Sequence, residues 1–384
     1  MKKNLNHQVT NIEISGIRQF FNLVSNKKDI ISLTIGQPDF PTPEHIKQAA
    51  KHAINMNYTT YTHNAGITPL RQAVAMYMEE KYNLTYRSED EVIVTVGASQ
   101  AIDITLRTIL TEGDEVILPG PIYPGYEPLI TLTGAKTVFV DTTTSGFKLT
   151  KELLRQHISP KTKCLILPYP SNPTGVSYTK KELSELVEEL KQRNIFILSD
   201  EIYSELNYEG KHYSIARFEE IKDKTIVING LSKSHAMTGW RIGFLLAPRW
   251  LSEHILKVHQ YNVSCATSIS QYAALEALTN GKNDAIYMRN EYRSRRDYVY
   301  DRLTKMGLEV TKPDGAFYFF PKLALGTMSS FELGIKLLEE AKLALVPGDA
   351  FSKHGQGYMR LSYAYDRETL EKGLDRLENF IQKK

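Results

Sequence analysis

Between residues 91 and 247, short continuous apolar runs alternate with longer stretches in which apolar residues recur at a helical period. Continuous apolar runs are typical of strands buried on both faces, and the helical period is typical of amphipathic helices. Strands that alternate with helices indicate parallel βαβ units with right-handed crossovers. We therefore predict an α/β fold whose large domain has a mostly parallel central sheet covered by helices. The expected strands are 92–96, 115–118, 137–140, 163–167, 195–198, 225–229 and 244–247.

The two ends of the chain follow a different pattern, which predicts a smaller α+β domain. A polar arm with a short helix near residues 16–18 and a strand at 30–35 is expected first. A long charged helix at 284–306 is expected to link the two domains. The remaining expected elements are strands 307–310, 316–320, 344–346 and 358–363, with helices 330–342 and 367–381. The predicted boundaries are 1–45 for the arm and part of the small domain, 46–283 for the large domain, and 284–384 for the linking helix and C-terminal small domain.

Length and composition narrow the functional classes. The chain has 384 residues, which is long for one hydrophobic core and also indicates two domains. A net charge of +3 produces no broad basic field, so we expect neither nucleic acid nor a membrane as a partner. Two distant cysteines fit a reducing cytosol, and the N-terminus lacks the apolar segment of a signal peptide. We therefore expect a cytoplasmic location, and we expect no metal site.

A single lysine stands out in the segment INGLSKSHAMTGWRIG, which spans residues 228–243. Lys233 follows the predicted strand 225–229, where burial lowers the pKa of an amine and lets it attack a carbonyl to form a Schiff base. A lone lysine in a loop is more often a surface residue. Here, however, Ser232 offers a hydroxyl and Arg241 a forked cation, both of which suit a phosphate. An aldehyde partner and a phosphate partner together indicate pyridoxal phosphate (PLP).

Four further segments also follow predicted strands. Gly97–Ser99 opens a helix with small residues, which makes either an anion site or an ordinary turn. Tyr123 lies in a proline-rich aromatic loop and could stack on a planar ring, whereas Asn172 lies in a segment that could be only a turn. Asp200 ends an apolar strand, where a carboxylate needs a partner such as a pyridinium N–H. Ligands of such sheets bind beyond the carboxyl ends of the strands, so we expect these segments to converge with Lys233.

These segments resemble the signature motifs of the class I aminotransferases, which are PLP-dependent enzymes. The resemblance extends from Gly36 to Arg360. The matching motifs are G-x-P-D-F from Gly36, Y-x-x-x-x-G-x-x-x-L-R from Tyr61, N-P-x-G from Asn172, D-E-x-Y from Asp200, S-K-x-x-x-x-x-G-x-R-x-G from Ser232, and R-[LI]-[SC] from Arg360.

The resemblance implies a role for each candidate residue. Lys233 is the Schiff-base and catalytic residue. Arg360 binds the substrate α-carboxylate, with Gly36, Asn172 and Tyr123 also at the substrate. The implied cofactor contacts are Gly97, Ala98, Ser99, Tyr123, Asn172, Asp200, Tyr203, Ser232, Lys233 and Arg241, together with Tyr61, which reaches across the interface of a homodimer with shared active sites. The implied substrates are an L-amino acid and a 2-oxo acid, with glutamate and 2-oxoglutarate as one pair.

Within this class, the chain is most similar to the N-acetyl-LL-diaminopimelate aminotransferases of bacilli, which serve lysine and cell-wall precursor synthesis. The segments that carry this similarity are S-G-I-R, G-P-I-Y-P-G-Y-E-P, P-Y-P-S-N-P-T-G-V, N-G-L-S-K-S-H and K-V-H-Q-Y-N-V-S-C-A. Such a long substrate needs a distal cation or donor. Ile17 and Arg18 of the arm are candidates, although Arg18 could instead pair on the surface or brace the arm.

Other functions remain open at this point. Transfer from aspartate, an aromatic amino acid or alanine is an alternative, as is a carbon–sulfur β-lyase on the same fold. A PLP-fold regulator is disfavoured because no DNA-binding domain precedes the arm. A Rossmann dehydrogenase is disfavoured because the only G-x-G, at residues 355–357, lacks its third glycine and follows no predicted strand.

Overall fold

A seven-stranded sheet forms the centre of the computed structural model, which describes residues 5–25 and 29–383. Its strand order is β2-β8-β7-β6-β5-β3-β4, and every adjacent pair is parallel except the two pairs made by β8. Because β8 runs against both neighbours, β2 points the same way as the parallel strands, and their carboxyl ends share one edge. The strands are β2 (Val92–Thr95), β3 (Glu115–Gly120), β4 (Lys136–Asp141), β5 (Thr162–Pro168), β6 (Phe196–Asp200), β7 (Thr225–Gly230) and β8 (Gly243–Leu246).

Helices cover both faces of this sheet because alternate side chains of each strand point to opposite faces. In β3, Val116 and Leu118 pack with residues of α5, α6 and α10, whereas Ile117 packs with residues of α7 and α8 on the other face. Both sets of side chains are fully buried. The helices of this part are α3 (Glu44–Asn55), α4 (Thr68–Tyr82), α5 (Gly97–Ile109), α6 (Tyr126–Thr131), α7 (Lys151–His157), α8 (Lys180–Leu190), α9 (Glu219–Lys222), α10 (Arg249–Val263) and α11 (Ser268–Thr279).

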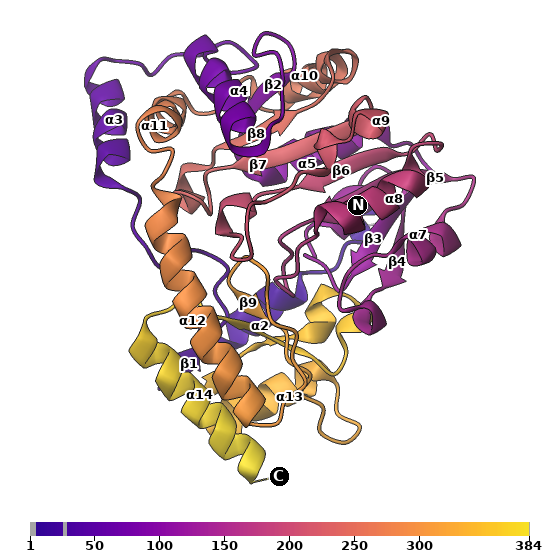
Figure 1. The fold of residues 1–384 in the computed structure, drawn as a ribbon, viewed down its shortest axis with the longest axis vertical. Helices are drawn as coiled ribbons and strands as arrows, with labels where there is room; N and C mark the ends of the chain where they lie inside the picture. The colour runs from indigo at the N-terminus through magenta and orange to yellow at the C-terminus, as the bar shows by residue number, and fades with distance from the viewer. Residues whose placement is uncertain (1–4, 26–28, 384) are drawn as a thin grey trace.

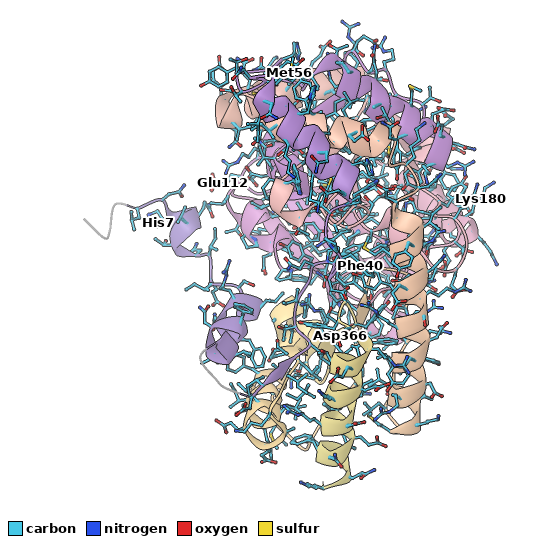
Figure 2. All side chains as sticks on the ribbon, turned by 90° about the vertical axis from the view of Figure 1, so that its left-hand side faces the viewer. His7, Phe40, Met56, Glu112, Lys180 and Asp366 are labelled. Carbon is cyan, nitrogen blue, oxygen red and sulfur yellow. The ribbon has the colours of Figure 1, made fainter. Side chains whose placement is uncertain are left out.

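The two chain ends form a second, smaller part, which lies below the sheet in Figure 1. A long helix, α12 (Ala285–Lys305), runs from the large part down along the small one. Figure 2 shows that α1, labelled at His7, stands away from the body of the molecule. The other elements are α1 (His7–Thr10), α2 (Gly16–Ser25), α13 (Ser330–Lys336) and α14 (Arg367–Gln382), with β1 (Ile31–Ser32), β9 (Tyr318–Phe319), β10 (Leu343–Ala344), β11 (Val346–Pro347) and β12 (Met359–Ser362).

Short strands of the small part form two sheets that position the substrate side of the cavity. β1 pairs in parallel with β10, and β12 lies between β11 and β9 in an antiparallel sheet. Within the described part of the chain, no helix is both long and apolar enough to cross a bilayer. The mostly parallel central sheet covered by helices confirms the predicted α/β fold, whereas the domain boundaries near residues 45 and 283 stay a prediction.

Side chains cap the N-termini of two helices. At α8 a capping box is present, in which the Thr179 hydroxyl accepts from the Glu182 N–H and the Glu182 carboxylate accepts from the Thr179 N–H. At α14 the Asp366 side chain accepts from the Thr369 N–H.

Two strand predictions were wrong. Residues 307–310 form no strand, and the expected strand 30–35 is reduced to β1. Beyond β1, the backbone of residues 33–36 bonds to other groups: the Leu33 carbonyl accepts from the Ser362 N–H, the Thr34 carbonyl from Arg360, and the Gly36 carbonyl from Lys233. The predicted helix 330–342 ends as a π-helical segment, Leu337–Ala341, and α6 and α7 were not predicted.

Candidate active site

A cavity of about 820 Å³ opens at the carboxyl edge of the large sheet, between that edge and the small part. Its wall includes all but two of the residues singled out in the sequence. Those that line it are Ile17, Arg18, Gly36, Ala98, Ser99, Tyr123, Asn172, Asp200, Tyr203, Ser232, Lys233, Arg241 and Arg360. The exceptions are Gly97, which packs against Arg241 at the cavity wall, and Tyr61.

Lys233 lies just beyond β7, as its position after an apolar run predicted. Its Nζ donates a hydrogen bond of 2.6 Å to the Gly36 carbonyl, which links the two parts of the molecule across the cavity. Burial, together with the nearby Arg360 and Arg241 cations, lowers the pKa of Lys233 to about 8, while the Asp200 charge opposes this shift. A minority of this amine is therefore neutral, and nucleophilic, at pH 7, and the neutral share reaches half near pH 8.

Asp200 ends β6 and is buried with its carboxylate toward the cavity. Its Oδ2 accepts a hydrogen bond of 2.7 Å from the Tyr126 hydroxyl, and its Oδ1 accepts one of 3.2 Å from the Ile202 N–H. Burial raises the pKa of Asp200 to about 6, while these two hydrogen bonds oppose the rise. The positive charge of Lys233 lowers the pKa of Asp200 but does not cancel the rise caused by burial. This carboxylate is therefore suited to a cationic N–H partner in the cavity.

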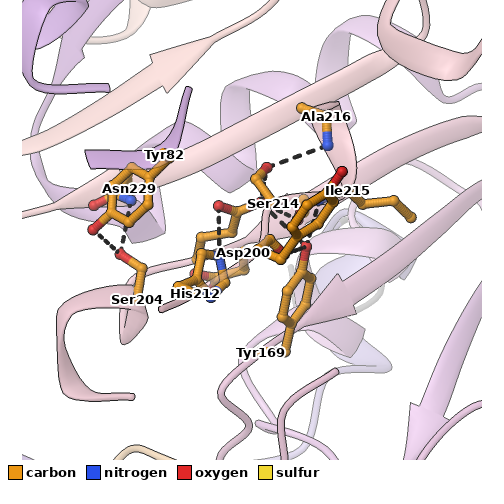
Figure 3. A network of polar contacts seen from close by, with 12 residues as sticks. Tyr82, Tyr169, Asp200, Ser204, His212, Ser214, Ile215, Ala216 and Asn229 are labelled. Carbon is orange, nitrogen blue, oxygen red and sulfur yellow. Dashed lines mark hydrogen bonds and ion pairs between the residues drawn. The ribbon is translucent and has the colours of Figure 1, made fainter. Parts of the chain in front are cut away.

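A buried polar network supports the end of β6 behind Asp200, as Figure 3 shows. Glu201 accepts hydrogen bonds from Ser199 at 2.8 Å and Ser214 at 2.6 Å, and its other oxygen lies 2.9 Å from His212 Nε2. Tyr169 stacks on the His212 ring, and the Tyr169 backbone N–H donates to the Asp200 carbonyl. Glu201 therefore has structural partners and does not line the cavity.

Arg241 and the first turn of α5 form an anion-binding cradle. Arg241 has a left-handed backbone with φ +52°, and its guanidinium lies over Gly97, where an added Cβ would be 2.6 Å from Nη2. Gly97 itself has φ +75°, a conformation that favours glycine. Below it, Gly243 of β8 approaches the same turn so closely that an added Cβ would be 2.6 Å from the Gly97 carbonyl carbon. The open backbone N–H groups of α5 and the guanidinium thus face a common space with the hydroxyls of Ser99 and Ser232.

Arg360 on β12 is a buried cation with no acidic partner among the described residues. It is 2% exposed, and its Nη1 and Nη2 donate to Asn172 Oδ1 at 3.0 Å and to the Thr34 carbonyl at 2.6 Å. Its Nε has no hydrogen-bond partner within the described chain. A buried guanidinium without a counter-ion is costly, so this arrangement suits an anion that enters the cavity.

Two tyrosines of the site were missed by the sequence reading. Tyr126, three residues after Tyr123, holds Asp200, and its ring lies edge-on to that of Tyr123, with centroids 5.5 Å apart. Tyr318 on β9 lies between Arg360 and Tyr203. The available signals were the two tyrosines in the proline- and glycine-rich residues 120–126 and the aromatic run 317–320, but neither pattern indicates which ring faces the cavity.

Tyr61 lies outside this cavity and is 88% exposed. No hydrogen bond or ring contact of its side chain occurs within the described part of the chain. The position is compatible with a role at another copy of the chain, and the assignment stays a prediction.

The chain belongs to the aminotransferases of classes I and II: the family model with that description matches residues 28–377. A probable N-acetyl-LL-diaminopimelate aminotransferase of Bacillus subtilis is 62% identical over 384 residues, covering 100% of this chain and 97% of that protein. An aspartate aminotransferase of Pyrococcus abyssi is 42% identical, with 96% of each chain covered. The crystal structure of Thermus thermophilus aspartate aminotransferase with maleate is 36% identical with a TM-score of 0.93, covering 98% of this chain and 99% of that one.

The protein is a PLP-dependent aminotransferase, and the residues present fit that cofactor. A neutral amine suits its aldehyde, a cradle of guanidinium, hydroxyls and helix N–H groups suits its phosphate, and a buried carboxylate suits its ring nitrogen. The substrates of this enzyme class are an amino acid and a 2-oxo acid.

Proposed function

We propose that the enzyme transfers an amino group between N-acetyl-LL-diaminopimelate and 2-oxoglutarate, forming L-2-acetamido-6-oxopimelate and glutamate. The observation that carries this proposal is a single cavity lined by one buried and one exposed arginine. Arg360 lies buried at the inner end and Arg18 of α2 lies at the outer wall. The 62% identity with the Bacillus subtilis relative, whose name contains this substrate, supports the same assignment.

Each residue of the inner end has a separate role in the proposed reaction. PLP, when bound, supplies an aldehyde that carries the amino group and a ring that accepts electrons. The Lys233 Nζ takes the proton from the substrate Cα and returns one to the product. Asp200 holds the proton on the ring nitrogen, and Arg360 clamps the α-carboxylate so that the Cα–H faces Lys233. Arg241, Ser232, Ser99 and the backbone of Gly97 and Ala98 hold the phosphate.

The outer end recognises the distal part of the substrate. Arg18 is exposed, lines the cavity and has no hydrogen-bond or ion-pair partner among the described residues. Ile17 packs beside it in a small apolar cluster that includes Phe351. An unpaired guanidinium suits the distal carboxylate of a long substrate better than it suits the short side chain of alanine.

The active unit is a homodimer with shared sites. Tyr61 of one protomer is proposed to donate to the cofactor phosphate of its partner, because it is exposed and lies outside its own cavity. Sedimentation at nanomolar concentration together with activity tests this: a fully active monomer contradicts it. Tyr61→Phe is expected to weaken PLP binding without changing the substrate preference.

A half-reaction screen tests the substrate. Each amino acid of a panel is mixed with the PLP enzyme, and the loss of visible absorbance is followed. N-acetyl-LL-diaminopimelate and glutamate are expected to react fastest. A preference for aromatic amino acids, aspartate or alanine contradicts the diaminopimelate assignment and leaves the aminotransferase class standing. Release of pyruvate from an S-alkyl cysteine would identify a β-lyase instead.

A further inference from the structure

Tyr318 lies where the substrate-binding and cofactor-binding groups of the cavity meet. It is on β9, opposite Ser362 of β12, so its side chain projects on the same face of the small sheet as Arg360 two residues away. The side chain is fully buried, yet it lines the cavity. None of the sequence motifs drew attention to it.

Three contacts fix the position of this ring. The Arg360 guanidinium carbon lies 4.5 Å from the ring centroid, which is a cation–π distance. The Tyr318 hydroxyl lies 2.8 Å from the Tyr203 hydroxyl. The same hydroxyl presses against Gly36, where an added Cβ would be 2.9 Å from the oxygen. Gly36 is also the residue whose carbonyl accepts from Lys233, so the Tyr318 side chain contacts both the carboxylate-binding arginine and a direct partner of the lysine.

The direction of the hydrogen bond between the Tyr318 and Tyr203 hydroxyls follows from the group that each hydroxyl faces. A neutral tyrosine has one proton to donate. If Tyr203 is to donate to the phenolic oxygen of the cofactor, Tyr318 must donate to Tyr203. The neighbouring Arg360 cation favours that direction because it makes the Tyr318 hydroxyl a stronger donor.

We propose that Tyr318 is a positioning residue that couples the carboxylate-binding end of the site to the cofactor ring. Its ring supports the Arg360 guanidinium, and its hydroxyl donates to Tyr203 so that the Tyr203 proton remains directed at the cofactor. When a substrate carboxylate neutralises Arg360, the Tyr318 hydroxyl becomes a weaker donor. The Tyr203 hydroxyl then supports negative charge on the cofactor oxygen less well. This inference rests on the proposed roles of Arg360 and Tyr203 but not on the identity of the amino acid.

The coupling between Tyr318, Tyr203 and the cofactor can be measured from the pH dependence of the visible absorbance of the PLP enzyme. The titratable groups facing the hydroxyl pair are Arg360, Tyr123, Tyr365 and Asp200, with Lys233 above the Tyr203 ring. Tyr318→Phe keeps the ring and removes the hydroxyl, so the phenolate form of the cofactor loses support. We expect the midpoint of the absorbance change to rise by about half a pH unit, the effect of losing one hydrogen bond.

The matched control is Tyr363→Phe. Tyr363 is an equally buried tyrosine of the same hydrophobic cluster, and its hydroxyl donates to the Ala316 carbonyl at 3.3 Å, away from the cavity lining. This variant is expected to leave the midpoint unchanged. A Tyr318→Phe midpoint within about 0.1 pH unit of the unmodified enzyme overturns the proposal, because a hydrogen bond of ordinary strength would shift it further.

A second measurement separates failure of this inference from failure of the carboxylate assignment. Maleate, which carries carboxylates but no amino group, is titrated into the unmodified enzyme, Arg360→Lys and Tyr318→Leu. Both variants are expected to bind maleate about tenfold more weakly or worse, since one changes the guanidinium and the other removes its supporting ring. Unchanged affinity in Arg360→Lys contradicts the proposed role of Arg360. Weakened affinity in Arg360→Lys but not in Tyr318→Leu contradicts only the role of Tyr318.

Discussion

The two ends of the cavity are built in different ways. The inner end combines Arg360 of the small sheet with residues at the carboxyl ends of the large sheet's strands, such as Asp200 and Lys233, and the side chains of these residues are held by hydrogen bonds. The outer end is provided by the arm, where Arg18 is exposed and unpaired within the described chain. The geometry of the inner end is therefore set by the folded protein, whereas Arg18 at the outer end lacks a partner within the described chain. Under the proposed function, the inner end carries the chemistry and the outer end selects the substrate.

Replacing Lys233 with alanine is expected to give the largest effect, because it removes both the cofactor anchor and the proton-transferring amine. Turnover should fall by on the order of 10⁴-fold or more. The visible absorbance of the resting enzyme should be lost at the same time. Spectra and single-turnover rates of the purified variant measure both, and substantial remaining turnover would show that another group moves the proton.

Asp200→Asn should act at the same end with a smaller effect. The amide cannot keep the ring nitrogen protonated, so kcat is expected to fall roughly 10²- to 10³-fold while PLP remains bound. Tyr126→Phe, which loses only the hydrogen bond to Asp200, is the graded comparison and should cost less. An unchanged kcat in Asp200→Asn is incompatible with the assigned role.

Arg18→Ala tests the outer end. We expect kcat/KM for N-acetyl-LL-diaminopimelate to fall about three- to tenfold, the size of one exposed ionic contact, while the half-reaction with alanine stays unchanged. Arg107→Ala, which removes an exposed arginine paired with Asp103 on α5, is the control. If Arg18→Ala lowered the rates with both substrates equally, Arg18 would stabilise the structure of the cavity and would not bind the distal part of the substrate.

The pKa of Lys233 predicts a small but distinctive pH effect. A pKa lowered to about 8 means that the amine is mostly protonated below pH 8 and mostly neutral above it. The rate at which the cofactor-free enzyme captures PLP should therefore rise with pH and level off above about 8, instead of rising toward 10. Because the Asp200 charge raises the pKa of Lys233, Asp200→Asn should move the midpoint to lower pH. A midpoint near 10 would show that Lys233 is not desolvated.

Asp200, Lys233 and the segments at Gly97 and Asn172 could be read from the sequence because each ends or follows an apolar strand, and strands that run in the same direction place their carboxyl ends at one edge. The long charged helix α12 was an equally local signal. The small part was harder to predict. Its strands are two to four residues long, and the backbone of residues 33–36 bonds to side chains from distant parts of the chain. Tyr126 and Tyr318 were not predicted for a related reason. Each lies in a segment with several aromatic residues, and tertiary packing alone determines which of the rings lies at the site.

The contact between Gly243 and Gly97 bears on how such an enzyme changes its substrate during evolution. No side chain fits at Gly243 without displacing the turn that is proposed to hold the phosphate, so we expect variation there to abolish the cofactor site instead of reshaping it. The exposed positions of α2 have no such constraint, and the Arg18 side chain bonds to none of the described residues. A mutational library aimed at new amino acids should therefore hold the two glycines and the buried Phe20 and Val24 of α2 constant, and vary exposed positions of α2 such as Arg18. Under the proposed roles, substrate choice and catalysis belong to separate stretches of the chain.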